Sequence, residues 1–339
     1  MIFLTTKQNL TIDDIARDLG VSKTTVSRAI SGKGRISPAT RQRVQEYIEQ
    51  CNYRPSAAAK GLAESKTYNL ALVLPRSFIN LDQPYTRMSM SAICEEAFIK
   101  DYNILVCLST DDTMAPLLRT LDNRKVDGVI LSRTVEHDAL VDILSKRGIP
   151  FATMGSLPND CQGKAAVEAD HDQVGGCRAF ATEFLHVCPG TVAVLGNDMN
   201  YIVNQSRIAG IRQAMKAQNL PEEKVAFYLD LKNNDLIYRA LDDLLAKGIR
   251  SILFMDDGVC FNALPHLKSL GLSIPADIRI ASLYDSDLVA NHNPPISALQ
   301  FDAAALGRVT CRELLRCLQG EDFDSQPILG YRIIHRSSF

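Results

Sequence analysis

The chain has 339 residues, of which 46% are hydrophobic and 22% are charged, and its formal net charge is −2. This length predicts two or three domains, and the apolar fraction is ample for a sizeable core. The composition excludes a disordered chain, a collagen-like chain and a coiled-coil rod, and no apolar stretch approaches the roughly 18–20 residues that a membrane span needs. The start, MIFLTTKQNL, is too short and too polar for a signal peptide, so we expect a cytoplasmic protein.

The charge is unevenly distributed along the chain. Residues 1–63 hold ten Lys and Arg against five Asp and Glu, which gives this segment a net charge of +5 and the remainder −7. A small basic segment joined to a larger acidic one is typical of a nucleic-acid-binding module attached to a domain with a different task.

Three short helical patterns follow one another in the basic segment. Thr11 precedes acidic residues as a helix cap does, and apolar residues then recur at i, i+3, i+4 and i+7. Gly20 supplies a turn, and Ser22 can cap a second helix over residues 23–30. Ser37, followed by proline, opens the third helix. This order predicts a helix-turn-helix, although a small three-helix interaction domain has the same apolar pattern.

The polar face of the second helix favours DNA as the partner. With Val26 and Ile30 turned inward, this face exposes hydroxyl and cationic side chains, namely Ser22, Lys23, Thr24, Ser27 and Arg28. Such groups suit base edges and phosphates in the major groove, and the helix N-terminus is itself an anion site. A merely solvated helix face would more often carry glutamate, and this face carries none.

Residues 11–65 resemble the DNA-binding head and hinge of the lactose-repressor (LacI/GalR) family. The resemblance is carried by I-x-D-I-A-x-x-x-G-V-S-x-x-T-V-S-R, then S-x-x-T-R-x-x-V, then N-Y-x-P, without a gap. It implies that Lys23 and Thr24 chiefly choose the operator. Phosphate and base contacts are implied for Ser22, Thr25, Ser27 and Arg28. We also assign Thr11, Ser37 and Tyr53 to the DNA-binding surface of a head that spans residues 1–54.

Residues 55–65 are expected to form a hinge. Alanines favour a helix there and Ser56 can cap it, but a segment this short is unstable alone, so a flexible linker is the alternative. The resemblance implies a helix that folds only on operator DNA and pairs with its twin in a dimer. It also implies that Leu62 is a wedge in a base step of the minor groove, with Ala59 and Lys60 beside it.

From residue 69 onwards, apolar runs alternate with helical patterns. The predicted strands are residues 70–74, 104–107, 128–131, 150–154, 192–195, 225–228, 251–255 and 279–282. Between most of them lie helical patterns over residues 87–100, 137–147, 173–186, 204–218, 234–247 and 259–269. This order predicts a doubly wound parallel α/β architecture, and its length favours two similar lobes.

The resemblance implies that the two lobes form a periplasmic-binding-protein-like body whose chain crosses between them three times. We place residues 66–159 with 290–320 in the first lobe. The second lobe then takes residues 160–289 with 321–339.

Doubly wound sheets bind small molecules beyond the carboxyl ends of their strands. Asp256 follows one predicted strand, and Tyr284 and Asp285 follow another. The resemblance implies that Arg207, Asp256 and Asp285 contact an effector, and that Phe301 lies where a contacting side chain commonly sits. The alternatives are a surface ion pair for Arg207 and ordinary turn positions for the two aspartates.

A neutral sugar is the effector that we expect first. A guanidinium and a carboxylate can each engage two vicinal hydroxyls, and an aromatic ring can cover the apolar face of a sugar. Two carboxylates disfavour an anionic ligand, and a nucleobase-like effector is the second choice. Asp256 departs from the family resemblance, which more often has asparagine at that position. Phe78, Tyr85 and Arg87 either line the first-lobe wall of the cleft or are simply exposed.

No catalytic or cofactor motif accompanies these features. The sequence lacks a dinucleotide-binding glycine motif, a Walker loop and a nucleophile elbow, and its cysteines and histidines show no metal-ligand spacing, so we expect neither metal, cofactor nor catalysis. The sequence predicts a dimeric, ligand-responsive regulator, most simply a repressor, that binds a pseudo-palindromic operator. The alternatives are a sugar-binding protein of transport and an enzyme built on the same body.

Overall fold

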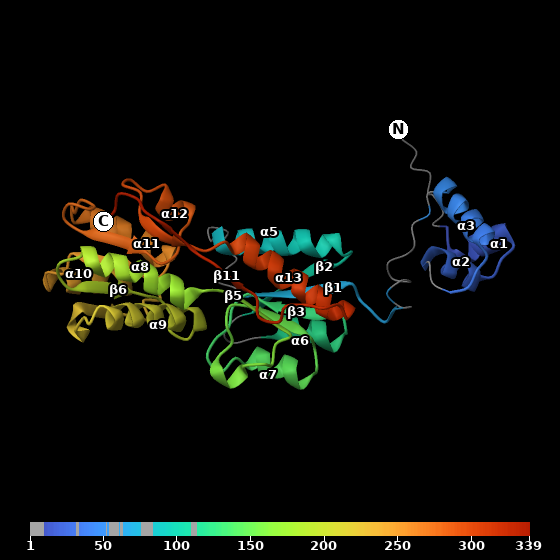
Figure 1. The fold of residues 1–339 in the computed structure, drawn as a ribbon, viewed down its shortest axis with the longest axis horizontal. Coiled ribbons are helices and arrows are strands. Elements are labelled where there is room, and N and C mark those ends of the chain that lie inside the picture. The colour runs from blue at the N-terminus through green and yellow to red at the C-terminus, as the bar shows by residue number, and fades with distance from the viewer. Residues whose placement is uncertain are drawn as a thin grey trace. The chain divides into compact units, whose positions relative to one another are not determined.

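The computed structural model describes residues 10–31, 34–51, 53, 61, 64–75, 84–109 and 114–339. The chain divides into two compact units, Met1–Thr67 and Tyr68–Phe339. The first unit contains a small helical head, and the second is a larger α/β body (Figure 1). The boundary between the units lies just beyond the predicted end of the hinge at residue 65.

Three helices form the head: α1 (Ile12–Leu19), α2 (Lys23–Ser31) and α3 (Pro38–Gln50). Thr11 begins α1 with a capping box, because its hydroxyl and the Asp14 carboxylate each accept a hydrogen bond from the other residue's backbone N–H. Gly20 ends α1 with a φ of 61°, a left-handed conformation that favours glycine. The three predicted helices and the turn are confirmed. They enclose a small core of Ile15, Ala16, Val26, Ala29 and Val44.

The first lobe of the body is built on a parallel sheet with the strand order β11-β5-β4-β3-β1-β2. Its strands are β1 (Asn69–Pro75), β2 (Asn103–Ser109), β3 (Gly128–Leu131), β4 (Phe151–Met154), β5 (Val167–His171) and β11 (Ile328–Leu329). One face packs against α5 (Pro84–Ile99) and α13 (Ala303–Gln319). The other packs against α6 (Ala115–Asp122) and α7 (Ala139–Lys146).

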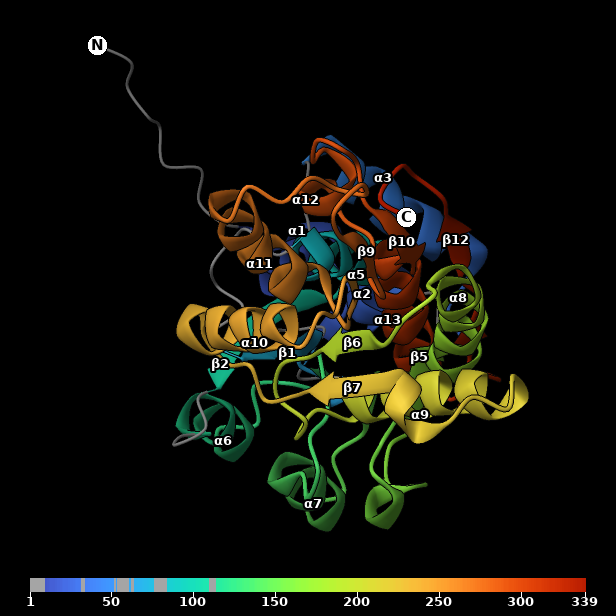
Figure 2. The same ribbon diagram turned by 90° about the vertical axis from the view of Figure 1, so that its left-hand side faces the viewer.

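The second lobe repeats this arrangement with the strand order β12-β10-β9-β8-β6-β7, in which β12 runs antiparallel to β10. Its strands are β6 (Val192–Leu195), β7 (Val225–Tyr228), β8 (Ser251–Phe254), β9 (Arg279–Ser282), β10 (Ser297–Gln300) and β12 (Arg332–Ile334). One face packs against α8 (Gln173–Val187) and α9 (Ile202–Ala217), the other against α10 (Asn234–Ala246) and α11 (Asp257–Ser269) (Figure 2). A short helix, α12 (Asp287–Ala290), follows β9. The predicted doubly wound, two-lobed body is confirmed.

Two helix pairs pack closely because each contains a glycine at the contact. A Cβ at Gly307 of α13 would lie 2.5 Å from the Ser89 carbonyl oxygen of α5. A Cβ at Gly210 of α9 would lie 2.6 Å from the Val174 carbonyl oxygen of α8. Neither backbone oxygen can move aside cheaply, so these glycines set how near the helices approach.

The chain crosses between the lobes three times, after β5, after β10 and after β11, but the structure corrects the predicted lobe boundaries. Residues 160–171, predicted in the second lobe, include β5 of the first sheet. Residues 297–300, predicted in the first lobe, form β10 of the second sheet, and β11, predicted in the second lobe, pairs with β5. The sequence did not reveal these strands: β5 reads V-E-A-D-H and β10 reads S-A-L-Q, and neither forms an uninterrupted apolar run.

Candidate functional site

The exposed face of α2 has the composition that the sequence predicts. Lys23, Thr24, Ser27 and Arg28 are exposed. Val26 is fully buried, and Ala29, at 2% exposure, is more deeply buried than Ile30. Hydroxyl and cationic groups therefore share one accessible surface, with the apolar groups on the opposite side of the helix.

Several of the predicted DNA contacts make local hydrogen bonds in the head. The Ser22 hydroxyl accepts a hydrogen bond from the Thr25 backbone N–H at 3.1 Å, and the two hydroxyl oxygens lie 2.8 Å apart. Ser37 caps α3 by accepting from the Thr40 N–H at 3.1 Å. Thr11 is the cap of α1. These hydroxyls thus fix the starts of the three helices, a task independent of any partner.

Lys23 and Tyr53 also have partners within the head. The Lys23 Nζ lies 2.5 Å from a carboxylate oxygen of Asp13 in α1, and both side chains remain more than half exposed. Tyr53 is half-buried and packs against the head core. The predicted hinge contacts Ser56, Ala59, Lys60 and Leu62 lie outside the described residues.

A cavity of about 840 Å³ lies in the body and is lined by both lobes. Its wall is built where strands end: Ser132 follows β3, Asp170 lies in β5, Asn197 follows β6, Asp256 follows β8, Tyr284 follows β9 and Phe301 follows β10. The carboxyl ends of parallel strands meet at one edge of each sheet, which is where such folds bind ligands. This volume suits a small organic molecule.

Five of the six predicted effector contacts are in the cavity lining: Tyr85, Arg207, Asp256, Tyr284 and Phe301. Arg87 also lines the cavity, although its side chain is exposed, and Phe78 lies outside the described residues. The sixth predicted contact, Asp285, is elsewhere in the second lobe.

Arg207 and Asp256 each keep one polar atom unpartnered. Arg207 is 7% exposed, and its Nη1 donates to the Met255 carbonyl at 2.7 Å, but its Nε meets no acceptor among the described residues. Asp256 caps α11 by accepting from the Val259 N–H at 2.8 Å through Oδ1, while its buried Oδ2 has no donor in that part of the chain. The Arg207 Nε is a hydrogen-bond donor, and the Asp256 Oδ2 is an acceptor.

Two further side chains of the lining complete this set. The Oε1 of Gln173, at the start of α8, and the Oγ of Ser132, after β3, are buried and have no hydrogen-bond partner within the described ranges. Buried polar atoms are normally hydrogen-bonded, and leaving one unpaired costs about 1–3 kcal/mol. Four such atoms around one cavity are what a bound polar molecule would satisfy.

Burial also shifts the proton affinities in the cavity. It raises the pKa of Asp257 to about 6, and the neighbouring Asp256 carboxylate adds to the rise while Arg207 opposes it. Burial lowers the pKa of Arg133 to about 10. Arg133 stays charged at neutral pH, and its guanidinium lies 3.6 Å from the centre of the Tyr201 ring. The site therefore combines buried charges of both signs, which favours neither a strongly anionic nor a strongly cationic ligand.

Aromatic rings line the cavity on both lobes. The Tyr85 ring of α5 meets the Tyr284 ring of the second lobe edge-on, with 5.7 Å between their centres. Phe301 lies 5.1 Å from the ring of His171, and burial lowers the pKa of that histidine to about 4, so it is neutral at physiological pH. These rings offer apolar faces beside the unpartnered polar atoms.

The lobes also meet on another side of the cavity. The Glu136 N–H donates to the Asn200 carbonyl at 2.9 Å, and Val135 and Tyr201 form a short antiparallel bridge. Because Arg133 and Tyr201 both line the cavity, this contact connects its walls directly.

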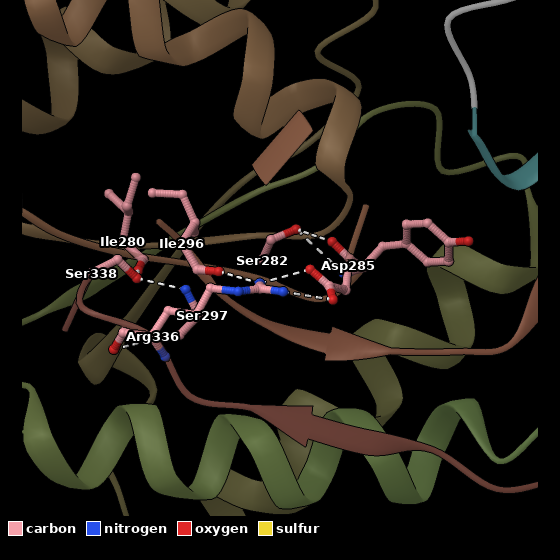
Figure 3. Close-up of polar contacts among 8 residues, drawn as sticks. Ile280, Ser282, Asp285, Ile296, Ser297, Arg336 and Ser338 are labelled. Atoms are coloured by element: carbon pink, nitrogen blue, oxygen red, sulfur yellow. Dashed lines mark hydrogen bonds and ion pairs between the residues drawn. The ribbon is translucent and has the colours of Figure 1, made fainter. Parts of the chain in front are cut away.

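Asp285, the sixth predicted effector contact, is engaged by another side chain of the second lobe. Both of its carboxylate oxygens accept hydrogen bonds from the Arg336 guanidinium, at 2.7 and 2.9 Å (Figure 3). Asp285 is not among the described residues that line the cavity. A carboxylate engaged on both oxygens by a partly buried arginine has little capacity left for ligand hydroxyls.

Sequence reasoning missed several polar residues of the lining, including Ser132, Arg133, Asp170, Gln173 and Asn197. Ser132 and Asn197 come directly after or within two residues of predicted strands, so the rule that found Asp256 would also have found them. Asp170 was missed together with its strand. Its carboxylate accepts hydrogen bonds from the Ser156 N–H and hydroxyl at 2.9 and 2.6 Å.

The described residues contain no group of three or more His, Cys, Asp or Glu side chains that could hold a metal ion. In the same part of the chain, no helix combines the length and apolar character that crossing a membrane requires.

Comparison with known proteins agrees with these features. Residues 11–56 match the family model of bacterial regulatory proteins of the lacI family, and residues 190–339 match that of the periplasmic binding protein-like domain. The chain is 25% identical to catabolite control protein A of Staphylococcus xylosus over 333 residues, covering 97% of this chain and 99% of that one.

Two solved structures share the fold. The transcriptional regulator CelR–cellobiose complex matches with a TM-score of 0.71 and 22% identity, over 97% of this chain and 100% of that one. The lac repressor dimer bound to operator and the anti-inducer ONPF matches with a TM-score of 0.76 and 18% identity, over 98% and 99%. The head at residues 11–56 is thus similar to that of bacterial regulatory proteins of the lacI family, and residues 190–339 are similar to the periplasmic binding protein-like domain.

Proposed function

We propose that the protein is a dimeric transcriptional repressor that binds a pseudo-palindromic operator through its head and a sugar in the cavity of its body. The ligand half of this proposal is carried by four buried polar atoms, of Ser132, Gln173, Arg207 and Asp256, that have no partner among the described residues. A cavity that offers donors, acceptors and aromatic rings together suits vicinal hydroxyls, each of which both donates and accepts. No catalytic step is part of the proposal.

The exposed face of α2 supports the DNA half. Lys23, Thr24, Ser27 and Arg28 occupy a helix that can enter the major groove, and the starts of the helices are fixed by Thr11 and Ser37. Operator binding would require Lys23 to exchange its contact with Asp13 for one with DNA. A protein with this task works in the cytoplasm.

An apolar surface on the first lobe supports assembly with a second copy of the chain. Phe98 and Ile99, at the end of α5, are 81% and 67% exposed, and Met88 on the same helix is 46% exposed. Apolar side chains exposed together in this way are typical of protein interfaces. A two-fold dimer formed there would present two heads to the two halves of a palindrome.

Effector binding would act on DNA through the lobes. A ligand that bridges side chains of both lobes favours whichever lobe arrangement offers all its contacts, and DNA and ligand must then change each other's affinity by the same factor. The sign of this coupling is set by which arrangement the operator-bound dimer adopts.

A thermal-shift screen with sugars, sugar acids and nucleobases tests the ligand class, with cellobiose included because of the CelR complex. Binding stabilises a protein by about 2.7 kcal/mol at a ligand concentration 100 times the Kd, which moves its Tm by several degrees. We expect neutral sugars to raise the Tm. Stabilisation by a purine and by no sugar would replace the sugar with a nucleobase effector.

The DNA half is tested by anisotropy titrations of the full chain with operator DNA selected from a random pool. We expect an affinity that falls steeply with salt, because phosphate contacts release counterions. Binding to no sequence at low salt would contradict it.

A further inference from the structure

The segment that follows β12 is built into the second lobe. Ser338 is fully buried, and its hydroxyl donates to the Ile280 carbonyl at 2.7 Å and accepts from the Ser297 N–H at 2.8 Å (Figure 3). The Phe339 ring packs edge-on against Phe184, 4.9 Å between centres. At the N-terminal side of this segment, Ile334 of β12 pairs with Ala298 of β10. The backbone around residue 336 is therefore anchored at both ends.

Arg336 uses this anchored backbone to hold Asp285. Its Nη1 donates to Asp285 Oδ1 at 2.7 Å and to the Ile296 carbonyl at 2.6 Å, and its Nη2 donates to Asp285 Oδ2 at 2.9 Å. The two side chains are 16% and 6% exposed. A paired, planar contact of this kind fixes both distance and orientation, and lysine cannot reproduce all of it.

The residue before Asp285 is Tyr284, which lines the cavity. The Tyr284 carbonyl accepts from the Ser282 hydroxyl at 2.7 Å, and the Asp285 N–H donates to the Leu299 carbonyl at 2.8 Å. The turn after β9 is thus held by backbone contacts and by Arg336. It places the Tyr284 ring, 7% exposed, against Tyr85 of the other lobe.

We propose that Arg336 is a positioning residue for effector recognition. By fixing Asp285 it sets the Tyr284 ring against Tyr85, and it withdraws the Asp285 carboxylate from the ligand, so that Asp256 is the acid that the ligand meets. The inference rests on the proposed function for the identity of its ligand, whereas the placement of Tyr284 is a property of the free protein.

The first test needs no ligand. The full chain is labelled with 3-fluorotyrosine, the Tyr284 resonance is assigned by its loss in Tyr284→Phe, and 19F spectra are compared between variants. Arg336→Met removes the guanidinium, Arg336→Lys keeps a charge, and Arg332→Met, an exposed arginine of β12, is the matched control. We expect the Tyr284 resonance to shift in Arg336→Met, to return most of the way in Arg336→Lys and to stay unchanged in the control.

Arg336→Met leaves a buried carboxylate uncompensated, which can prevent folding. The double variant Asp285→Asn/Arg336→Met removes both charges together and keeps the test decisive, with folding checked by circular dichroism. It should fold and still show a shifted Tyr284 resonance. A Tyr284 resonance at the parent position in the folded double variant would overturn the proposal.

The second test measures ligand affinity by calorimetry, with cellobiose as the probe. We expect binding about tenfold weaker in the double variant, equivalent to about 1.4 kcal/mol, and unchanged in Arg332→Met. Parent-like affinity in the double variant would overturn the role of Arg336 in recognition. If the parent protein binds neither cellobiose nor any other sugar, the sugar proposal fails, and the 19F comparison still decides whether Arg336 positions Tyr284.

Discussion

The candidate contact groups of the head and those of the body differ in solvent exposure and in whether their polar atoms have hydrogen-bond partners. On α2, Lys23 and Arg28 are exposed, and the neighbouring hydroxyls of Ser22 and Thr25 are bonded to each other. In the cavity, Arg207 and Asp256 each bury a polar atom that has no partner within the described residues. An exposed group gains little when it exchanges water for a partner, whereas a buried one recovers a missing hydrogen bond. Single substitutions should therefore cost more in the cavity than on the head.

The largest effect is expected for Arg207→Ala. Removing a buried charged donor should weaken binding of the sugar identified by the thermal screen roughly 100-fold, about 2.7 kcal/mol, as measured by calorimetry. Lys216→Ala, at an exposed position of the same helix, is the control and should bind like the parent. An affinity within threefold of the parent in Arg207→Ala would place the ligand elsewhere.

Asp257 should make the stability of the body depend on pH. Burial raises its pKa to about 6, above the value of about 3.9 in an unfolded chain. A carboxyl with a raised folded pKa stabilises the protein below pH 4, and this contribution is lost as the pH rises through 6. Asp257→Asn should abolish that loss and be more stable than the parent at pH 7 by about 2 kcal/mol.

Urea unfolding at several pH values measures this effect. Asp287→Asn, an exposed carboxylate on α12, is the control and should keep the parental pH dependence. The same slope between pH 4 and 6 in Asp257→Asn as in the parent would show that this carboxyl is not the source.

A smaller effect is expected on the head. Arg28→Ala should weaken operator binding by roughly tenfold and lower the slope of log K against log salt by about 1, because one phosphate contact is lost. Anisotropy titrations over a salt series measure both quantities. Lys125→Ala, an exposed lysine of the body, should change neither. An unaltered salt slope in Arg28→Ala would remove this residue from the DNA surface.

The smallest effect should come from the caps. Thr11→Ala removes the hydroxyl that accepts from Asp14, and we expect α1 to lose about 1 kcal/mol, seen as roughly fivefold faster amide hydrogen exchange in that helix. Thr11→Asn retains a capping side chain and should exchange like the parent. Equal exchange in all three proteins would mean that the cap contributes nothing measurable.

Sequence patterns predicted the helices and strands in which apolar residues form an unbroken run or recur at regular spacing. Strands β1, β3 and β8 were found because each contains an apolar run, and the head helices were found because their apolar residues recur at helical spacing. β5 was missed because Glu168, Asp170 and His171 interrupt its apolar run. The Asp170 and Glu168 carboxylates find their hydrogen-bond partners in the Ser156–Leu157 segment, which local periodicity does not reveal. The lobe boundary near residue 160 was misplaced as a consequence, and the boundary near residue 290 was misplaced because β10 was not predicted either.

Strand ends predicted Asp256 and Tyr284 as residues of the cavity, and the family resemblance added Arg207 and Phe301. All four line the cavity, whereas Asp285 does not, although it directly follows Tyr284. Its position is decided by Arg336, which lies 51 residues further along the chain and belongs to no local pattern. A pairing of this kind depends on the tertiary fold and is invisible to periodicity.

A crystal structure of the protein with the sugar that stabilises it most tests the central claim, that buried unpartnered atoms mark the effector site. We expect sugar hydroxyls within hydrogen-bond distance of Arg207 Nε and Asp256 Oδ2, and Asp285 still held by Arg336. A sugar bound elsewhere, or one in the cavity that leaves both atoms without a partner, would contradict it.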